Sequence, residues 1–358
     1  MFTFKKYRLT IFLLVIAAAI HVYSVDSERV ENSYSQVIFP FISLLQRSFL
    51  GWIPFSIGDI LYSALIIYFI YRLIKYFKNR KRMPLQWKKG ILKGLNFLLL
   101  VYISFNIFWG LNYNRAGVLV KLNIRDTTYS EKELLMLNEF LVRQVNASKH
   151  EWINEGKSYP GNKEMFEMVE RSYSVASEKY NFLKYKPSSI KPSLWSIAGN
   201  YLGFTGYYNP FTGEGQVNTT TPNFLHPFTA CHEVAHQIGY AKEMEANFVG
   251  ALAAMHSSEP LVRYSVYLDL FFYANRNLYL SDSSTAKKLR DKLTVPVKKD
   301  IDEWRRFQLE HRSFFEPLFR WAYGKFLERN QQPQGIMAYD EVTAFIIAYY
   351  KKEGILNP

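Results

Sequence analysis

Residues 231–248 read CHEVAHQIGYAKEMEANF, and the spacing of the polar residues within this stretch decides how the whole chain is interpreted. His232 and His236 are four residues apart, so on a helix both side chains lie on one face. A glycine after this segment predicts the end of the helix, and a second helix is predicted to follow soon afterwards. Glu243 and Asn247 share one face of that second helix. The stretch therefore predicts two consecutive helices that present two imidazoles, one carboxylate and one amide.

These side chains have the chemistry of a metal site. Two imidazoles on one helix face can bind one ion, and Glu233 beside the first histidine can act as a general base toward water. We expect His232 and His236 to be ligands and Glu243 to be the third ligand, because catalytic zinc takes three protein ligands and keeps an open position. Glu245 is the alternative third ligand, since the two glutamates cannot both point at one ion.

The predicted cofactor is Zn²⁺, with Asn247 expected to form a hydrogen bond to a ligand histidine. The predicted reaction is hydrolysis of peptide bonds in a peptide or protein substrate, with Glu233 as the catalytic base. Two alternatives stay open. The paired histidines can be ordinary helix residues, or the protein can be an inactive zinc-binding membrane protein that binds peptides or partners of the cell envelope.

Three apolar segments near the N-terminus reach the length of about 20 residues that a helix needs to cross a membrane. They cover residues of about 7–25, 57–77 and 91–111. We therefore predict a membrane region over residues 1–111 and a separate, mainly helical domain over residues 112–358. An uncleaved first span is favoured over a signal peptide, because no small-residue cleavage pattern follows it.

The formal net charge of +13 suggests nucleic-acid binding only until the positions of the charges are considered. No acidic residue occurs between Asp59 and Asp126. Nine basic residues lie between or at the ends of the second and third apolar segments: Arg72, Lys75, Lys78, Arg80, Lys81, Arg82, Lys88, Lys89 and Lys93. Positive charge of this kind is typical of a cytoplasmic loop. We therefore predict no nucleic-acid partner, a cytoplasmic N-terminus and an extracytoplasmic domain; nothing indicates the oligomeric state.

Two further patterns describe the predicted domain. Ser130 followed by Glu133 is a capping box that predicts the start of a helix. Residues of about 201–220 contain an aromatic-rich segment and a second, polar segment on either side of an Asn-Pro-Phe-Thr-Gly turn, which predicts a β-hairpin beside the metal helix. The hairpin is a candidate for holding an extended substrate by strand addition, although a hairpin that only packs on the metal helix is equally compatible with the pattern.

Peptide hydrolysis also requires a hydrogen-bond donor for the oxyanion of the transition state. The residue types allow several candidates for this role or for substrate binding: Tyr207, Tyr208, His226, Arg263 and Tyr264. The sequence favours none of them, because aromatic residues are abundant throughout the chain.

The His232-Glu233-x-x-His236 motif followed by Glu243-x-x-Ala246-Asn247 resembles the gluzincin zinc metallopeptidases. The resemblance implies a zincin-like α+β domain in which Glu243 is the third zinc ligand. More of the chain resembles an uncharacterised bacterial family of three-pass membrane proteins assigned to the zinc-peptidase clan. The segments that carry this likeness are residues 108–113, 206–214, 227–229 and 231–248. It implies a multi-pass protein of the bacterial inner membrane.

Overall fold

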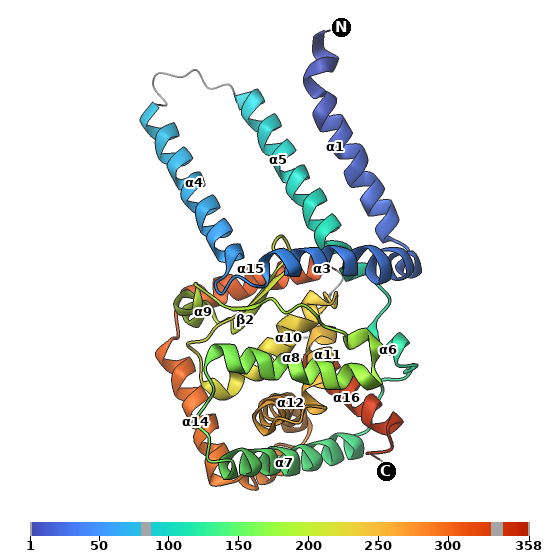
Figure 1. Cartoon of the computed structure of the whole chain (residues 1–358), viewed down its shortest axis with the longest axis vertical. Helices are drawn as coiled ribbons and strands as arrows, with labels where there is room; N and C mark the ends of the chain where they lie inside the picture. Colours follow the sequence, from blue (N-terminus) through green and yellow to red (C-terminus); the bar gives the residue numbers. More distant parts are fainter. Residues whose placement is uncertain (1, 80–86, 331–338, 357–358) are drawn as a thin grey trace.

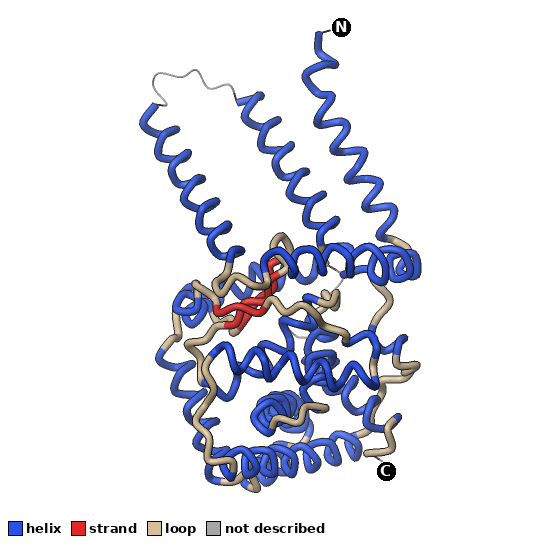
Figure 2. Tube along the Cα trace, in the orientation of Figure 1, coloured by secondary structure: helices blue, strands red, loops and turns tan. Residues whose placement is uncertain are grey.

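The computed structural model describes residues 2–79, 87–330 and 339–356, and it is mainly helical (Figure 2). Three of its helices are long and apolar enough to cross a membrane, over Tyr7–Ser24, Ile57–Lys78 and Gly90–Phe108. They form most of α1 (Phe2–Ser24), α4 (Ile57–Asn79) and α5 (Trp87–Phe108). The three predicted spans are confirmed. Arg80, Lys81 and Arg82 of the predicted basic loop lie outside the described residues.

The three spans extend from one side of the helical body (Figure 1). The C-terminal end of α1, the N-terminal end of α4 and the C-terminal end of α5 all lie next to the body, so the spans alternate in direction. This alternation is the arrangement that three crossings require. The identity of the membrane and the side on which the body lies stay predictions.

The segment between the first two spans packs onto the body instead of forming a simple loop. It contains α2 (Ser27–Arg29), the π-helix η1 (Val30–Ile38) and α3 (Phe39–Leu50). Val30, Tyr34 and Phe39 are buried in a second hydrophobic cluster with Trp109 and Tyr113, which follow the third span. This cluster joins the membrane-proximal parts of the chain to the body.

The body is built from helices around one large hydrophobic core. After η2 (Gly110–Asn114) its helices are α6 (Val118–Lys121), α7 (Glu131–Asn154), α8 (Asn162–Lys179), η3 (Asn181–Leu183), α9 (Ser196–Leu202), η4 (Asn223–Leu225), α10 (His226–Gln237), α11 (Glu243–Met255), α12 (Pro260–Ser281), α13 (Ser283–Asp291), α14 (Val295–Glu310), α15 (Phe315–Arg329) and α16 (Tyr339–Lys352). The capping box is confirmed at the start of α7, where Ser130 Oγ accepts from the Glu133 N–H.

A small three-stranded sheet lies beside α10, with the strand order β1-β3-β2. Strands β2 (Gly206–Asn209) and β3 (Glu214–Val217) are antiparallel, which confirms the predicted hairpin. The third strand, β1 (Ile190–Pro192), pairs with β3 in parallel and was not predicted, because three residues are too few to show a strand pattern. β2 lies at one edge of the sheet.

The sheet also holds the start of the second span. The Glu214 carboxylate on β3 accepts hydrogen bonds from the backbone N–H groups of Ile57 and Gly58, at 3.1 and 2.6 Å. The N-terminal N–H groups of a helix have no partner within the helix and favour negative charge. Glu214 therefore stabilises the N-terminus of α4 and fixes that span to the sheet next to α10.

Candidate metal centre

The two predicted helices of residues 231–248 are α10 and α11. Pro227 occupies the first turn of α10, where a missing N–H costs nothing. Gly239 follows the helix with a φ of 94°, and a Cβ there would lie 2.8 Å from the Phe39 ring. Only glycine satisfies both the left-handed backbone and this close approach. The chain therefore turns sharply after α10 and brings α11 back against it.

This turn brings the three predicted ligands together. His232, His236 and Glu243 each offer one donor atom, and these atoms all lie within 4.8 Å of one another, so the cluster could hold a metal ion. The His232 Nε2 atom lies 3.2 Å from Glu243 Oε2, and the His236 Nε2 atom lies 3.6 Å from Glu243 Oε1. Two imidazoles and one carboxylate match the donor set of catalytic zinc sites.

The other nitrogen of each imidazole is already occupied. His232 Nδ1 lies 2.8 Å from Asn247 Oδ1, and His236 Nδ1 lies 2.7 Å from the Tyr240 carbonyl oxygen. Both partners are acceptors, so each Nδ1 donates its proton, and each Nε2 faces the cluster and can offer a lone pair to a metal ion when it is not protonated. Ligand histidines in metal sites are commonly oriented in this way. The structure therefore places Asn247 in its predicted position.

We expect an Asn247→Ala variant to bind its metal ion about 10- to 100-fold more weakly than the wild type, because partners that orient a ligand histidine typically contribute this much. The affinity can be measured by competition with a chromogenic chelator. Asn154→Ala on the exposed end of α7 is a matched control that should leave the affinity unchanged. An unchanged affinity in Asn247→Ala would show that the orientation of His232 does not depend on this amide.

Glu233 lies against the sheet, not among the ligands. A Cβ on Gly206 would lie 2.5 Å from Glu233 Oε1, and a Cβ on Gly215 would lie 3.0 Å from Glu233 Cβ, so both strands need glycine where they pass this side chain. Glu233 is buried, and its Oε2 atom has no hydrogen-bond partner among the described residues. Burial raises the pKa of Glu233 to about 8, with His232 opposing and Glu243 adding to the rise.

The electrostatics of the three candidate ligands are set by burial and by one another. Burial lowers the pKa of His232, but the hydrogen bond and charge of Glu243 outweigh this effect and raise it to about 9. Burial dominates at His236 and lowers its pKa to about 4. Burial alone would raise the pKa of Glu243, yet the two histidines and Tyr323 bring it down to about 2. The Glu243 carboxylate therefore carries the negative charge that a cation site requires.

Glu245, the alternative ligand, points elsewhere. It is buried, and its carboxylate accepts a hydrogen bond from the backbone N–H of Val118 at the start of α6. A Cβ on Gly117 would lie 2.7 Å from Glu245 Oε1. Residues two positions apart lie on nearly opposite faces of a helix. Glu245 therefore supports α6 while Glu243 joins the histidines.

Of the five candidate donors, the two hairpin tyrosines lie on the strand next to Glu233. Tyr207 is already engaged, since its hydroxyl donates to Asp59 and lies 3.0 Å from Ser193 Oγ. The Tyr208 ring packs 5.1 Å from the Trp109 ring and 6.4 Å from the His236 ring. The Tyr208 hydroxyl is buried and has no partner among the described residues.

The structure does not bring the other three candidates to the cluster. His226 begins α10, and its Nε2 atom lies 2.8 Å from the Thr221 carbonyl. Arg263 on α12 donates to the Ser257 carbonyl and to Glu151 of α7. Tyr264 donates to Asp300 at 2.6 Å within the core. Each side chain has a structural partner that residue type alone does not reveal.

Two residues near the cluster were not predicted. The Tyr323 hydroxyl on α15 donates to Glu243 Oε1 at 2.6 Å. Asp269 on α12 has one buried carboxylate oxygen without a partner among the described residues, and burial raises its pKa to about 6, with a hydrogen bond from Tyr273 and the nearby His232 opposing. Tyr323 is 80 residues from its partner and left no signal in the sequence. Asp269 has a signal in the sequence, because it is a lone acid in an otherwise apolar and aromatic stretch of α12.

The C-terminal end of α10 is held by three donors from other parts of the chain. The last carbonyl groups of a helix lack partners within it. Trp109 Nε1 donates to the His236 carbonyl at 3.2 Å, Ser43 Oγ to the Gln237 carbonyl at 2.7 Å, and Arg115 Nη1 to the Gly239 carbonyl at 2.8 Å. The end of the metal helix is therefore fixed by residues next to the spans.

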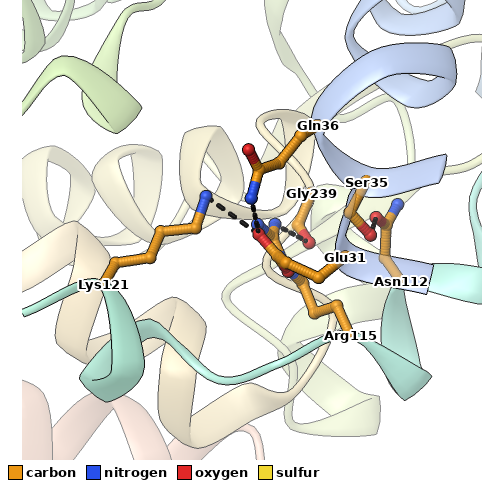
Figure 3. A network of polar contacts seen from close by, with 7 residues as sticks. All are labelled: Glu31, Ser35, Gln36, Asn112, Arg115, Lys121 and Gly239. Carbon is orange, nitrogen blue, oxygen red and sulfur yellow. Dashed lines mark hydrogen bonds and ion pairs between the residues drawn. The ribbon is translucent and has the colours of Figure 1, made fainter. Parts of the chain in front are cut away.

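Arg115 belongs to a buried polar network (Figure 3). Its guanidinium forms two hydrogen bonds of 2.8 Å to Glu31 of η1, and Lys121 lies 3.0 Å from the same carboxylate. Burial raises the pKa of Glu31, but Arg115 and Lys121 more than compensate and hold it below its ordinary value. The network thus connects η1, α6 and the turn after α10.

We expect Arg115→Met to lower the free energy of unfolding by about 3–5 kcal/mol, because removing one partner of a buried pair leaves the other poorly compensated. Denaturant titration of the detergent-solubilised protein measures this loss. Arg171→Met is the control: Arg171 pairs with Glu259 but is half exposed, and such pairs contribute about 0–1 kcal/mol. Equal losses in the two variants would contradict a structural role for the network.

The spans, the helical body and the His-His-Glu cluster together define a membrane protein with a candidate metal-binding site. The chain belongs to the family described as protein of unknown function (DUF3810), whose family model matches residues 34–347. The matched region begins in η1 and includes two of the spans and the whole cluster. No curated protein and no solved structure matches the chain. The expected membership of an uncharacterised family is confirmed, and the resemblance to gluzincins stays a prediction.

Proposed function

We propose that this protein is a zinc-dependent peptidase that hydrolyses peptide bonds outside the cytoplasmic membrane. The observation that carries the proposal is the convergence of His232, His236 and Glu243, with both imidazole Nε2 atoms directed at one carboxylate. The motif of Glu233 and the two histidines, followed by Glu243 on the next helix, resembles the gluzincin arrangement. The proposed zincin-like character of the body rests on this local resemblance.

Zinc fits the residues better than a harder cation does. Two neutral imidazoles and one carboxylate are the donors that zinc prefers, whereas magnesium and calcium take mainly oxygen ligands. When bound, zinc would supply Lewis-acid chemistry that polarises the scissile carbonyl and makes water a better nucleophile. With three protein ligands, the site retains a position for water or substrate.

Glu233 supplies the proton transfers. A cation held by the neighbouring ligands would favour the ionised form of Glu233 and offset the rise in its pKa. The unpartnered Oε2 atom of this carboxylate can then accept a proton from the attacking water while the water oxygen bonds to the scissile carbonyl carbon. Glu233 then passes this proton to the amine nitrogen as the C–N bond breaks, so the reaction needs no covalent enzyme intermediate. An inactive binding protein has no need for a base at this position.

The sheet supports binding of an extended substrate. β2 is an edge strand, and its first residue, Gly206, passes directly against Glu233. A peptide that adds to this edge would run alongside the general base, since strand addition aligns the two backbones. Tyr323, whose hydroxyl reaches Glu243, and Tyr208, whose ring lies beside that of His236, are the candidates for donating to an oxyanion.

A peptide library tests the proposal on the full chain in detergent or vesicles. We expect the zinc-loaded wild type to cleave library peptides into two fragments, as measured by mass spectrometry, and a Glu233→Gln variant to leave them intact. Binding of library peptides by the wild type without any cleavage would instead indicate the inactive zinc-binding alternative.

A further inference from the structure

The ends of the three spans mark the surface of the bilayer on the side of the helical body. Two helices of the body lie crosswise at this level, α3 and α15 (Figure 1). Phe326 of α15 packs 6.2 Å from Phe105, which lies in the last turn of the third span. The loop after β2 is also at this level, because Phe211 packs 6.5 Å from Phe108 at the end of the same span.

On α3 the apolar side chains face outward and polar side chains face the protein, which is the opposite of a water-exposed helix. Its polar residues Ser43 and Arg47 are buried, and Arg47 donates to the Pro187 carbonyl at 2.9 Å. Its large apolar side chains point outward: Phe41 is 61% exposed and Phe49 is 71% exposed. A helix on the surface of a soluble protein buries its apolar face instead. The outward environment of α3 is therefore apolar.

The charges in the sequence agree with this conclusion. Between Asn32 and Gly58, Arg47 is the only charged residue of the sequence, and it faces the protein. Large exposed apolar residues lie at the end of η1, on α3 and in the segment that follows it: Val37, Ile38, Phe41, Leu44, Leu45, Phe49, Trp52 and Phe55. Monomeric soluble proteins rarely expose a continuous apolar surface of this kind to water.

α15 presents further large apolar side chains at the level of α3. Phe314, directly before the helix, is 87% exposed, and Phe315, Leu318 and Trp321 are each more than half exposed. Lys325 and Arg329 follow on the later turns of the helix, where long basic side chains can extend to lipid headgroups. Tryptophan, phenylalanine and lysine together are typical of helices that lie in the plane of a membrane surface.

We propose that the exposed faces of α3 and α15 are immersed in the surface layer of the same bilayer that the three spans cross. The occupant is lipid because both helices adjoin the ends of spans that already lie in it, and because α3 presents no charge for a protein partner to recognise. The inference does not depend on the peptidase activity, since it rests on exposure, charge and position alone.

This position has a direct consequence for the candidate metal centre. Tyr323 lies on α15 and donates to the ligand Glu243 at 2.6 Å, so α15 contacts lipid on one face and the metal centre on another. The metal centre is therefore within one helix diameter of the membrane surface, about 10–12 Å.

The test uses nitroxide labels on single added cysteines in the full chain, reconstituted in phosphatidylcholine and phosphatidylglycerol vesicles. The native Cys231 is fully buried, and labelling of the wild type measures its background. Phe49→Cys reports on α3 and Phe315→Cys on α15. Val295→Cys on α14 is the matched control, because Val295 is 66% exposed and the preceding residue bonds to Asn146 of α7, away from the spans.

The measurement compares collisions of each label with oxygen, which dissolves in lipid, and with a nickel chelate, which stays in water. We expect the oxygen-to-nickel accessibility ratio to be several-fold higher at positions 49 and 315 than at position 295. A ratio at either position equal to that at 295 overturns the proposal. Spin–spin broadening at positions 49 or 315 also overturns it, because a second copy of the chain would then cover this face.

Discussion

Replacing Glu233 with glutamine is expected to lower kcat for peptide cleavage by about 10²- to 10⁴-fold, the range that a general acid–base group contributes. Glutamine keeps the shape of the side chain but cannot accept the proton of the attacking water. Glu233 is not among the three clustered ligands, so the variant should retain the metal content of the wild type. Turnover and elemental analysis on the same preparation separate the two effects.

Glu164→Gln is the matched control, because Glu164 is an exposed glutamate on the first turn of α8. It should cleave peptides as fast as the wild type. If Glu233→Gln retains full activity on a substrate that the chelated protein does not cleave, Glu233 is not the base and the mechanism proposed above is wrong.

Replacing Glu243 with glutamine is expected to weaken metal binding by more than about 100-fold, which exceeds the effect of changing a residue that only orients a ligand. The substitution removes the negative charge that balances the cation, and it leaves two imidazoles as the remaining strong donors. Metal retained after dialysis against a chelator, measured by elemental analysis, should fall from one ion per chain toward background.

Glu245→Gln provides the comparison for Glu243→Gln. Glutamine at 245 can still accept the hydrogen bond from the Val118 N–H, so this variant should keep its metal. His150→Ala on the exposed surface of α7 controls for the loss of a histidine in a parallel His232→Ala variant. If Glu245→Gln loses its metal while Glu243→Gln retains it, the third ligand is Glu245 and the prediction for Glu243 is wrong.

The elements that sequence reasoning predicted are those with strong local signals. The spans are long apolar segments, α7 begins with a capping box, and the candidate ligands follow from i, i+4 spacing on two neighbouring helices. All of these signals are contained within about 20 residues, the length over which periodicity is informative. The positions of His232, His236, Glu243 and Asn247 were predictable for this reason.

The features that were not predicted depend on contacts between distant parts of the chain. Tyr323 reaches Glu243 only because α15 packs beside the end of the third span. Arg263 and Tyr264 were plausible donors by residue type, but Glu151 and Asp300 hold them elsewhere. α3 is apolar but too short to cross a membrane, so its contact with the bilayer depends on where the neighbouring spans place it.

The bonds that close the end of α10 bear on how this protein can be studied. Trp109 and Ser43, which hold the carbonyls of His236 and Gln237, both precede residue 112, where a water-soluble fragment would naturally be made to begin. Glu31, the partner of Arg115, would be lost with them. Truncation would thus leave two helix-terminal carbonyls without their partners and one buried guanidinium without its carboxylate. Expression of the intact polypeptide is therefore the sound route to a sample with its histidine pair correctly held.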